Sequence, residues 1–443
     1  MVHRPRGCSV ESMTDSTPRF SWRSIILPVY LPTLVFSLGE GAMIPIVPLV
    51  ATERGASLAL AGLIAAMLMV GELAGDLPAG WLVARIGERN AMIGAAMLAV
   101  IGVLIAIVSP TLPALAIGVF LLGLATAVFG LARHAFLTSY VPVRTRARAL
   151  STLGGVFRAG WAVGPFVAAA IIASTGSSES VFWVLVGACF AVIGVLVLLP
   201  DPERVFGAAR LAREASAASA ATATDASGAP LTAGEAEAAA ESSPSVFRAI
   251  RENRGVLARI GTGVGLLAAV RVSRTVVLPL WSVSIGMPAE QAALVIGISG
   301  TIDFALFYAS GQIMDRFGRL WSAIPGLLGM AVGHIALAFT HDLPSNALWF
   351  TVIAVWLGLA NGVTSGIIMT LGADLAPKQN PAPFLGAFRM IGDTGGAGAP
   401  LMIAAVTSIA SIMAANVAVG VLGLVGAAML WRWIPRYVPH RRR

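Results

Sequence analysis

The sequence predicts an all-α integral membrane protein with 12 transmembrane helices, arranged as two pseudo-symmetric six-helix bundles. Three observations lead to this fold class. The chain of 443 residues is 57% hydrophobic and 12% charged, with a mean hydropathy of +0.83, whereas a soluble domain needs more charge on its surface. Apolar runs of about 20 residues recur along the chain, each long enough to cross a bilayer as a helix. The second half of the chain also repeats the first.

The apolar runs define twelve predicted spans, at 24–50, 57–83, 91–109, 113–140, 149–174, 180–199, 257–285, 289–314, 320–340, 346–373, 382–409 and 412–434. Their continuous character, as in "AMIGAAMLAVIGVLIAIVS", excludes the short alternating strands of a transmembrane β-barrel. The spans divide the chain into an N-terminal tail (1–23), a first bundle (24–199), a linker (200–255), a second bundle (256–434) and a basic tail (435–443).

The linker has a different composition from the spans. It is rich in Ala, Ser, Thr and Glu and poor in large apolar residues, so we expect it to be largely disordered. At its end, "SVFRAIRENRGVLARI" places apolar residues such as Ile250 and Leu257 among arginines, which predicts a short amphipathic helix on the membrane surface. The N-terminal stretch lacks an apolar core with a cleavage site, so we predict no cleaved signal peptide.

The net charge of +8 is explained by membrane topology. If both termini and the linker lie on one side, nearly all Lys and Arg residues outside the spans fall on that side, and Arg54 alone falls on the other. By the positive-inside rule, we expect a multi-pass protein of the cell (plasma) membrane with both termini cytoplasmic. We expect no nucleic-acid partner. Cys8 and Cys189 predict neither a disulfide framework nor a metal site.

An internal repeat appears when the sequence is shifted by 231 residues against itself. A single chance match would be unremarkable, but several matches at one offset indicate duplicated halves of the same orientation, with a substrate site between them. The matched pairs are Gly80 with Gly311, Arg85 with Arg316, Gly87 with Gly318, Glu72 with Asp303, Glu40 with Arg271, and Arg158 with Arg389.

Two motifs resemble those of the major facilitator superfamily. The stretch "GQIMDRFGR" is similar to its signature loop, Gly-x-x-x-Asp-Arg-x-Gly-Arg, through Gly311, Asp315, Arg316, Gly318 and Arg319. The first-half copy keeps Gly80, Arg85, Gly87 and Arg89 but has Ala84 at the aspartate position. The segment "GWAVGP" partly resembles a motif of antiporters, through Gly160, Gly164 and Pro165.

The resemblance implies a secondary transporter that works by alternating access, with a small-molecule substrate, no cofactor and a functional monomer. It also implies that the two loops gate the cytosolic side by contacts made in one conformation and broken in the other. The alternative is that their arginines only anchor the topology. Ala84 then predicts that the first-half gate is the weaker one.

Carboxylates within the spans are candidates for proton coupling, since a charge near the bilayer centre needs a reason. Two hypotheses have equal weight for Glu40, Glu72 and Asp303: each is either a proton carrier or a partner in a static ion pair. Glu72 and Asp76 lie one helical turn apart on one face. For Asp76, closer to the helix end, we favour a structural role.

Arginines within the spans are candidates for substrate binding or charge pairing. Arg271 and Arg274 share a helix face, so we expect one to pair with an acid such as Glu40. The other is expected to meet either an anionic substrate group or a carboxylate that takes up and releases a proton. Arg389 and Asp393 are expected to neutralise each other within one helix. Arg158 has no acid within one turn of its helix, and Arg133 is expected to reach the interface along its own stem.

The leading functional prediction is proton-coupled export of a drug or metabolite, and the alternative is proton-coupled uptake of an organic anion. The absence of a Walker motif argues against ATP drive from this chain. We predict neither an enzyme nor a bound metal. Two distant alternatives are an intramembrane hydrolase built on Ser299 and His334, and a non-transporting sensor.

Overall fold

The computed structural model describes residues 26–141, 143–199, 250–377 and 381–438. The predicted N-terminal tail, most of the linker and the end of the basic tail lie outside these ranges. Every long segment described is helical, because a helix satisfies its own backbone hydrogen bonds where no water is available.

The first bundle contains six membrane segments. The first is interrupted at its prolines: a π-turn η1 (Ile26–Tyr30), α2 (Leu31–Met43), a 3₁₀ turn η2 (Ile44–Ile46) and α3 (Val47–Glu53) follow one another without a gap. The other five are α4 (Leu58–Ile86), α5 (Glu88–Val108), α6 (Leu112–Tyr140), α7 (Val143–Thr175) and α8 (Phe182–Leu198), the last preceded by η3 (Ser178–Val181).

The second bundle repeats this plan. It begins with a short α12 (Arg254–Val256) and η4 (Leu257–Gly261). These two turns lie at the end of the segment predicted as a surface helix. Residues 245–249 of that segment lie outside the described residues. The helices of the second bundle are α13 (Thr262–Ser284), α14 (Ala289–Phe317), α15 (Arg319–Ala338), α16 (Asn346–Val363), α17 (Ile367–Leu375), α18 (Pro381–Ile409) and α19 (Ile412–Tyr437). The α16 and α17 helices together form one span that is broken in the middle.

The twelve predicted spans all coincide with helices in the described residues. Eleven of these segments are long and apolar enough to cross a membrane by length and composition. The remaining one, predicted at 382–409, is the helix α18, which carries Arg389 and Asp393 and packs against α13, α19 and α4. The last helix continues to Tyr437, beyond the predicted end of its span at 434.

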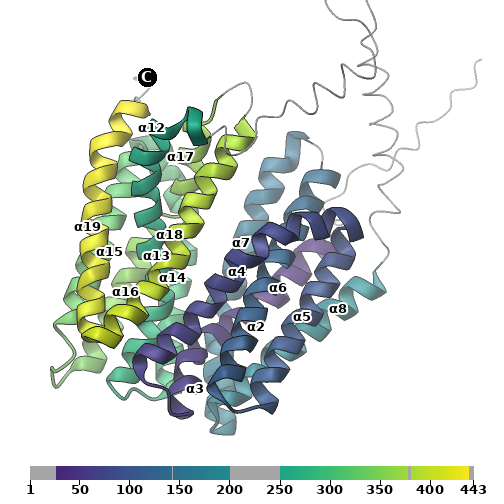
Figure 1. Cartoon of the computed structure of the whole chain (residues 1–443), viewed down its shortest axis with the longest axis vertical. Coiled ribbons are helices and arrows are strands. Elements are labelled where there is room, and N and C mark those ends of the chain that lie inside the picture. Colours follow the sequence, from purple (N-terminus) through teal and green to yellow (C-terminus); the bar gives the residue numbers. More distant parts are fainter. Residues whose placement is uncertain (1–25, 142, 200–249, 378–380, 439–443) are drawn as a thin grey trace, which may run out of the picture.

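The two bundles lie side by side, and the end of α19 lies at the same end of the molecule as α12 (Figure 1). Between the bundles, α7 packs against α14, and α4 packs against α18. The η2 and α3 segments also contact α13. The contacts of α7 with α14 and of α4 with α18 are equivalent under the sequence repeat.

Glycine allows the same close helix crossing in both bundles. A side chain at Gly164 of α7 would meet the backbone of α2 at Gly41, and a side chain at Gly395 of α18 would meet the backbone of α13 at Gly265. Gly164 and Gly395 correspond at the offset of the sequence repeat. Small residues at helix crossings replace the hydrophobic effect as a source of close packing in lipid.

The two loops that carry the repeated motif have the same backbone shape. Gly87 between α4 and α5 has φ +80°, and Gly318 between α14 and α15 has φ +95°. Both conformations are open to glycine at little cost and strained for other residues. The glycines of the motif therefore have a structural reason in each half.

Candidate functional site

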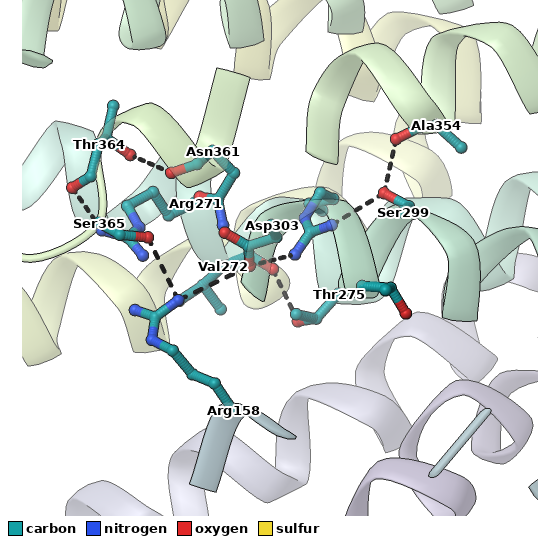
Figure 2. Close-up of polar contacts among 12 residues, drawn as sticks. Arg158, Arg271, Val272, Thr275, Ser299, Asp303, Ala354, Asn361, Thr364 and Ser365 are labelled. Atoms are coloured by element: carbon teal, nitrogen blue, oxygen red, sulfur yellow. Dashed lines mark hydrogen bonds and ion pairs between the residues drawn. The ribbon is translucent and has the colours of Figure 1, made fainter. Parts of the chain in front are cut away.

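Asp303 is the centre of a polar cluster between the bundles (Figure 2). It lies in the middle of α14, and its side chain is 12% exposed. Its Oδ2 lies 3.1 Å from Nη2 of Arg274 on α13. Arg274 Nη1 also donates to the hydroxyl of Ser299, at 2.9 Å, and Ser299 donates to the carbonyl of Ala354 at 2.6 Å. This chain of contacts joins α13, α14 and α16.

Arg158 brings the other bundle into the same cluster. It projects from the middle of α7, and its Nη1 lies 3.7 Å from Oδ2 of Asp303 and donates to Ser365 Oγ at 3.3 Å. Its guanidinium also lies over the ring of Phe307, 4.9 Å from the centroid, an attractive cation–π geometry. The helix of Arg158 carries no acid within one turn, and its acidic partner, Asp303, lies on α14. The sequence of α7 alone therefore could not reveal this pair.

Arg271 contacts the break between α16 and α17. Gly366 adopts φ +82° there, and its neighbours Thr364 and Ser365 are buried. Arg271 Nη1 donates to the carbonyl of Thr364 at 3.0 Å. The hydroxyl of Ser310 donates to the carbonyls of Val363, at 2.8 Å, and of Ser365. A non-helical turn at this depth is tolerated because protein groups satisfy its carbonyls.

Positive charge exceeds negative charge in this cluster. Arg158, Arg271 and Arg274 carry three positive charges, and within the described residues Asp303 is the acid that forms ion pairs with Arg158 and Arg274. Asp303 Oδ1, Arg274 Nε and Asn361 Oδ1 are buried without a hydrogen-bond partner in that part of the chain. Buried polar groups are nearly always satisfied, so this cluster has unused capacity for a ligand.

Glu40 lies in a separate polar cluster inside the first bundle. It is fully buried on α2 and accepts hydrogen bonds from Thr126 Oγ1 at 2.5 Å and Trp161 Nε1 at 3.0 Å. Among the described residues, neither of the two arginines considered as a partner of Glu40 pairs with it: Arg271 is directed to the α16–α17 break and Arg274 to Asp303. Both hydrogen-bond donors to Glu40 are neutral, so within the described residues no direct ion pair holds this carboxyl group in its ionised form.

Arg133 lies in an environment that differs from the one predicted from the sequence. It was expected to reach the interface, but it is 8% exposed and its guanidinium lies 4.7 Å from the ring centroid of Phe157. It is within electrostatic reach of Glu40 and Glu72. Phe129, four residues earlier on α6 and 6.0 Å away, is the one sequence signal that could have indicated this environment.

The remaining acids lie along the contact between α4 and α18. Glu72 is half-buried on α4, and Asp76 is exposed one turn further along. Arg389 and Asp393 form the predicted ion pair within α18, at 3.3 Å. Asp393 and Asp76 interact electrostatically with each other, and Asp76 interacts with Arg389. The pair on α18 and the two acids of α4 therefore form one mixed-charge strip between the bundles.

In the first-half loop, the arginines contact their own bundle. Arg89 donates to the carbonyls of Leu196 at 2.8 Å and Leu199 at 3.2 Å, so it caps the end of α8, where carbonyls lack helical partners. Arg85 lies over the ring of Trp81, 5.2 Å from its centroid. Gly80 is exposed near Leu131.

In the second-half loop, Arg319 has the main contacts. Its Nε lies 2.8 Å from Oδ2 of Asp374 on α17, a partner that the sequence did not reveal. Asp315 lies 3.6 Å from Nη1 of Arg319, and its side chain is 82% exposed. Arg316 is exposed at the end of α14, and Gly311 has open space beside it. In the part of the chain that the structure describes, the ion pair of Asp315 is with Arg319 of its own bundle.

The antiporter-like motif on α7 has a packing reason. A side chain at Gly160 would meet Ser37 and the backbone of Leu34, and one at Gly164 would meet the backbone of Gly41. Pro165 lies inside the helix, directly after this crossing. The motif therefore sets the approach of α7 to α2.

Ser299 and His334 do not form the pair required by the hydrolase hypothesis. Ser299 is bonded to Ala354 and Arg274 as described, while Nδ1 of His334 lies 3.0 Å from Oδ1 of Asn416 on α19. The hydroxyl thus donates its proton to a carbonyl, so the histidine is not its base in this conformation.

Comparisons with known proteins agree with this architecture. The model of the Major Facilitator Superfamily matches residues 29–400. The galactose-proton symporter of Escherichia coli K12 is 24% identical over 312 residues, which cover 68% of this chain and 66% of that protein, just under two thirds. The partially occluded inward-open structure of the xylose transporter XylE from E. coli has a TM-score of 0.68 at 16% identity and covers 93% of this chain and 98% of that one. A peptide transporter POT in complex with sulfate has a TM-score of 0.71 at 13% identity, covering 95% and 97%.

Proposed function

The chain belongs to the Major Facilitator Superfamily and is a multi-pass membrane transporter, and on that premise we propose that it couples the movement of a small molecule to protons by alternating access. The observation that carries the coupling is the position of Asp303. This single carboxylate faces Arg274 of its own bundle and Arg158 of the other bundle.

Protonation of Asp303 removes the charge that attracts both arginines. The contact with Arg158, at 3.7 Å, crosses the interface between the bundles, so its loss weakens the connection between them. A charged contact that forms and breaks with protonation is a two-state element of the kind that alternating access requires. Glu40, held by neutral donors inside the first bundle, is a second proton-binding group in this proposal.

The related galactose-proton symporter supports proton coupling. At 24% identity its support for a sugar substrate is weaker than its support for proton coupling. A neutral sugar would not balance the charge of three arginines beside one aspartate. The excess of arginines favours an organic anion as the cargo.

Export of a drug or metabolite remains the second candidate. Its support is the resemblance of Gly160, Gly164 and Pro165 to a motif of antiporters. Gly160 and Gly164 lie where α7 crosses α2. Helix packing therefore explains these glycines without any role in the direction of transport.

Flux in proteoliposomes under an imposed pH gradient tests the coupling. We expect Asp303→Asn to abolish the response of flux to the gradient. The control is Asp342→Asn, which alters an exposed loop acid beside His341 and should leave the response unchanged. Equal gradient-driven flux in the wild type and in Asp303→Asn would refute Asp303 as the coupling group. Reversing the gradient with the same panel separates uptake from export.

A further inference from the structure

We infer that the cluster around Asp303 binds a small anion with two negative charges, held between Arg158 of the first bundle and Arg271 of the second. The chemical class is a dicarboxylate or a phosphate monoester. This inference rests on the proposed function to the extent that the cluster is the transport site, and it narrows the class of the substrate.

The charge balance is the first step. Three guanidinium groups and one carboxylate leave two positive charges at the centre of the span, and within the described residues the ion pairs of the cluster are those of Asp303 with Arg158 and Arg274. Unbalanced charge is costly at this depth. An anion with two charges brings the cluster to neutrality, whereas a neutral sugar leaves the imbalance in place.

The unused donors are the second step. An arginine carries five N–H donors, and within the described residues Arg158 and Arg271 form hydrogen bonds through Nη1 alone. The side chain of Arg158 is 26% exposed, and Arg271 is also partly exposed. The remaining N–H groups are free for a forked contact with carboxylate or phosphate oxygens, the arrangement for which arginine is best suited.

The third step is the convergence of the two arginines on one turn. Arg271 contacts Thr364 and Arg158 contacts the next residue, Ser365, so guanidinium groups from opposite bundles meet at the α16–α17 break (Figure 2). The two like charges repel each other, and an anion that lies between them offsets this repulsion. A ligand with two acidic oxygen groups contacts both arginines and so links the two bundles directly.

Equilibrium binding to the purified full-length chain in detergent tests the inference, at pH 8 and constant ionic strength. The probes are inorganic phosphate, succinate, acetate and galactose. We expect phosphate or succinate to bind at least about 10-fold more tightly than acetate and galactose, the factor that one additional charge-assisted contact supplies. Succinate alone identifies a dicarboxylate site, phosphate alone identifies a phosphate site, and equal binding of acetate or galactose overturns the inference.

Variants then locate the binding. Arg158→Gln and Arg271→Gln are each expected to weaken the preferred probe about 10-fold or more, and Arg432→Gln, an exposed arginine beside Trp433, is the matched control. Unchanged binding in both site variants contradicts the inference. If a glutamine variant does not fold, the corresponding lysine variant retains the charge and is expected to keep part of the preference for two charges over one.

The outcome is separable from that of the proposed function because binding is measured without a gradient. Arginine-dependent binding of the divalent probe, together with unaltered gradient-driven flux in Asp303→Asn, would refute coupling at Asp303 and retain the anion site. Loss of coupling in Asp303→Asn without any preference for divalent anions would refute the anion site and retain the coupling.

Discussion

The two bundles carry opposite charges at one pair of repeat-equivalent positions, Glu40 and Arg271. In the first, Glu40 and Glu72 are accompanied by Arg133, whose guanidinium lies beside the rings of Phe129 and Phe157. In the second, Arg271 and Arg274 are accompanied by Asp303. Arg271 occupies the position equivalent to Glu40 at the offset of 231 residues. Duplication thus preserved the helices while separating an acid-rich polar cluster from an arginine-rich one.

This difference suggests a division of tasks between the bundles. In the first bundle, Glu40 accepts hydrogen bonds from neutral donors and lies within electrostatic reach of Arg133, a setting in which a carboxyl group can change its protonation state. The arginines of the second bundle suit an anion, and Arg158 reaches across from the first bundle to join them. The following substitutions test the comparison, from the largest expected effect to the smallest.

Arg274→Gln should be the most destabilising change, since it removes the closer of the two cations that contact Asp303. Loss of one partner from a buried ion pair costs about 3 kcal/mol or more. Thermal unfolding of the protein in detergent measures this effect. The double variant Arg274→Gln with Asp303→Asn should recover part of the loss, and no recovery would contradict the pairing.

Gly164→Ala on α7 and Gly395→Ala on α18 should have comparable effects in the two bundles. Each added methyl group meets the backbone of the crossing helix, so we expect a loss of about 1–3 kcal/mol from overpacking. Gly187→Ala is the control, since Gly187 has open space beside it. A large loss in one bundle only, measured by thermal unfolding, would show that the crossings are not equivalent.

Glu40→Gln should reduce stability by only about 1 kcal/mol, since the amide oxygen retains one of two hydrogen bonds from Thr126 and Trp161. Its effect on the response of flux to a pH gradient should be much greater, because glutamine cannot release a proton. A flux response equal to that of the wild type would assign Glu40 to structure alone and leave coupling to the second bundle.

Asp315→Asn should change thermal stability by less than about 0.5 kcal/mol, as expected for an exposed charge with one weak ion pair. Asp374→Asn should cost more, since Asp374 holds Arg319 at 2.8 Å. If Asp315 gates the other conformation, as the family resemblance implies, its substitution should increase the accessibility of a cysteine introduced on the predicted cytosolic side of the membrane. The same assay applied to Ala84→Asp tests whether the first-half gate is weakened. No shift in either variant would leave the loops as topology anchors.

Much of the fold followed from the sequence alone. Hydropathy located the spans, because only a helix of about 20 residues satisfies its backbone across lipid. The repeat predicted two equivalent bundles, and the positive φ at Gly87 and Gly318 agrees with the motif glycines. The pair of Arg389 and Asp393 was also predictable, because their spacing of four residues brings them together on any helix.

The partners of Arg158, Arg271 and Glu40 were decided by the tertiary structure. Arg158 meets Asp303 from a helix more than a hundred residues away, Arg271 turns to the α16–α17 break, and Glu40 turns to Thr126 and Trp161 instead of an arginine. Arg133, expected at the interface, is enclosed by aromatic rings. Helical periodicity determines which residues share a face of one helix, but the choice of neighbouring helix depends on how the bundles pack, and that choice determines the partner of each buried charge.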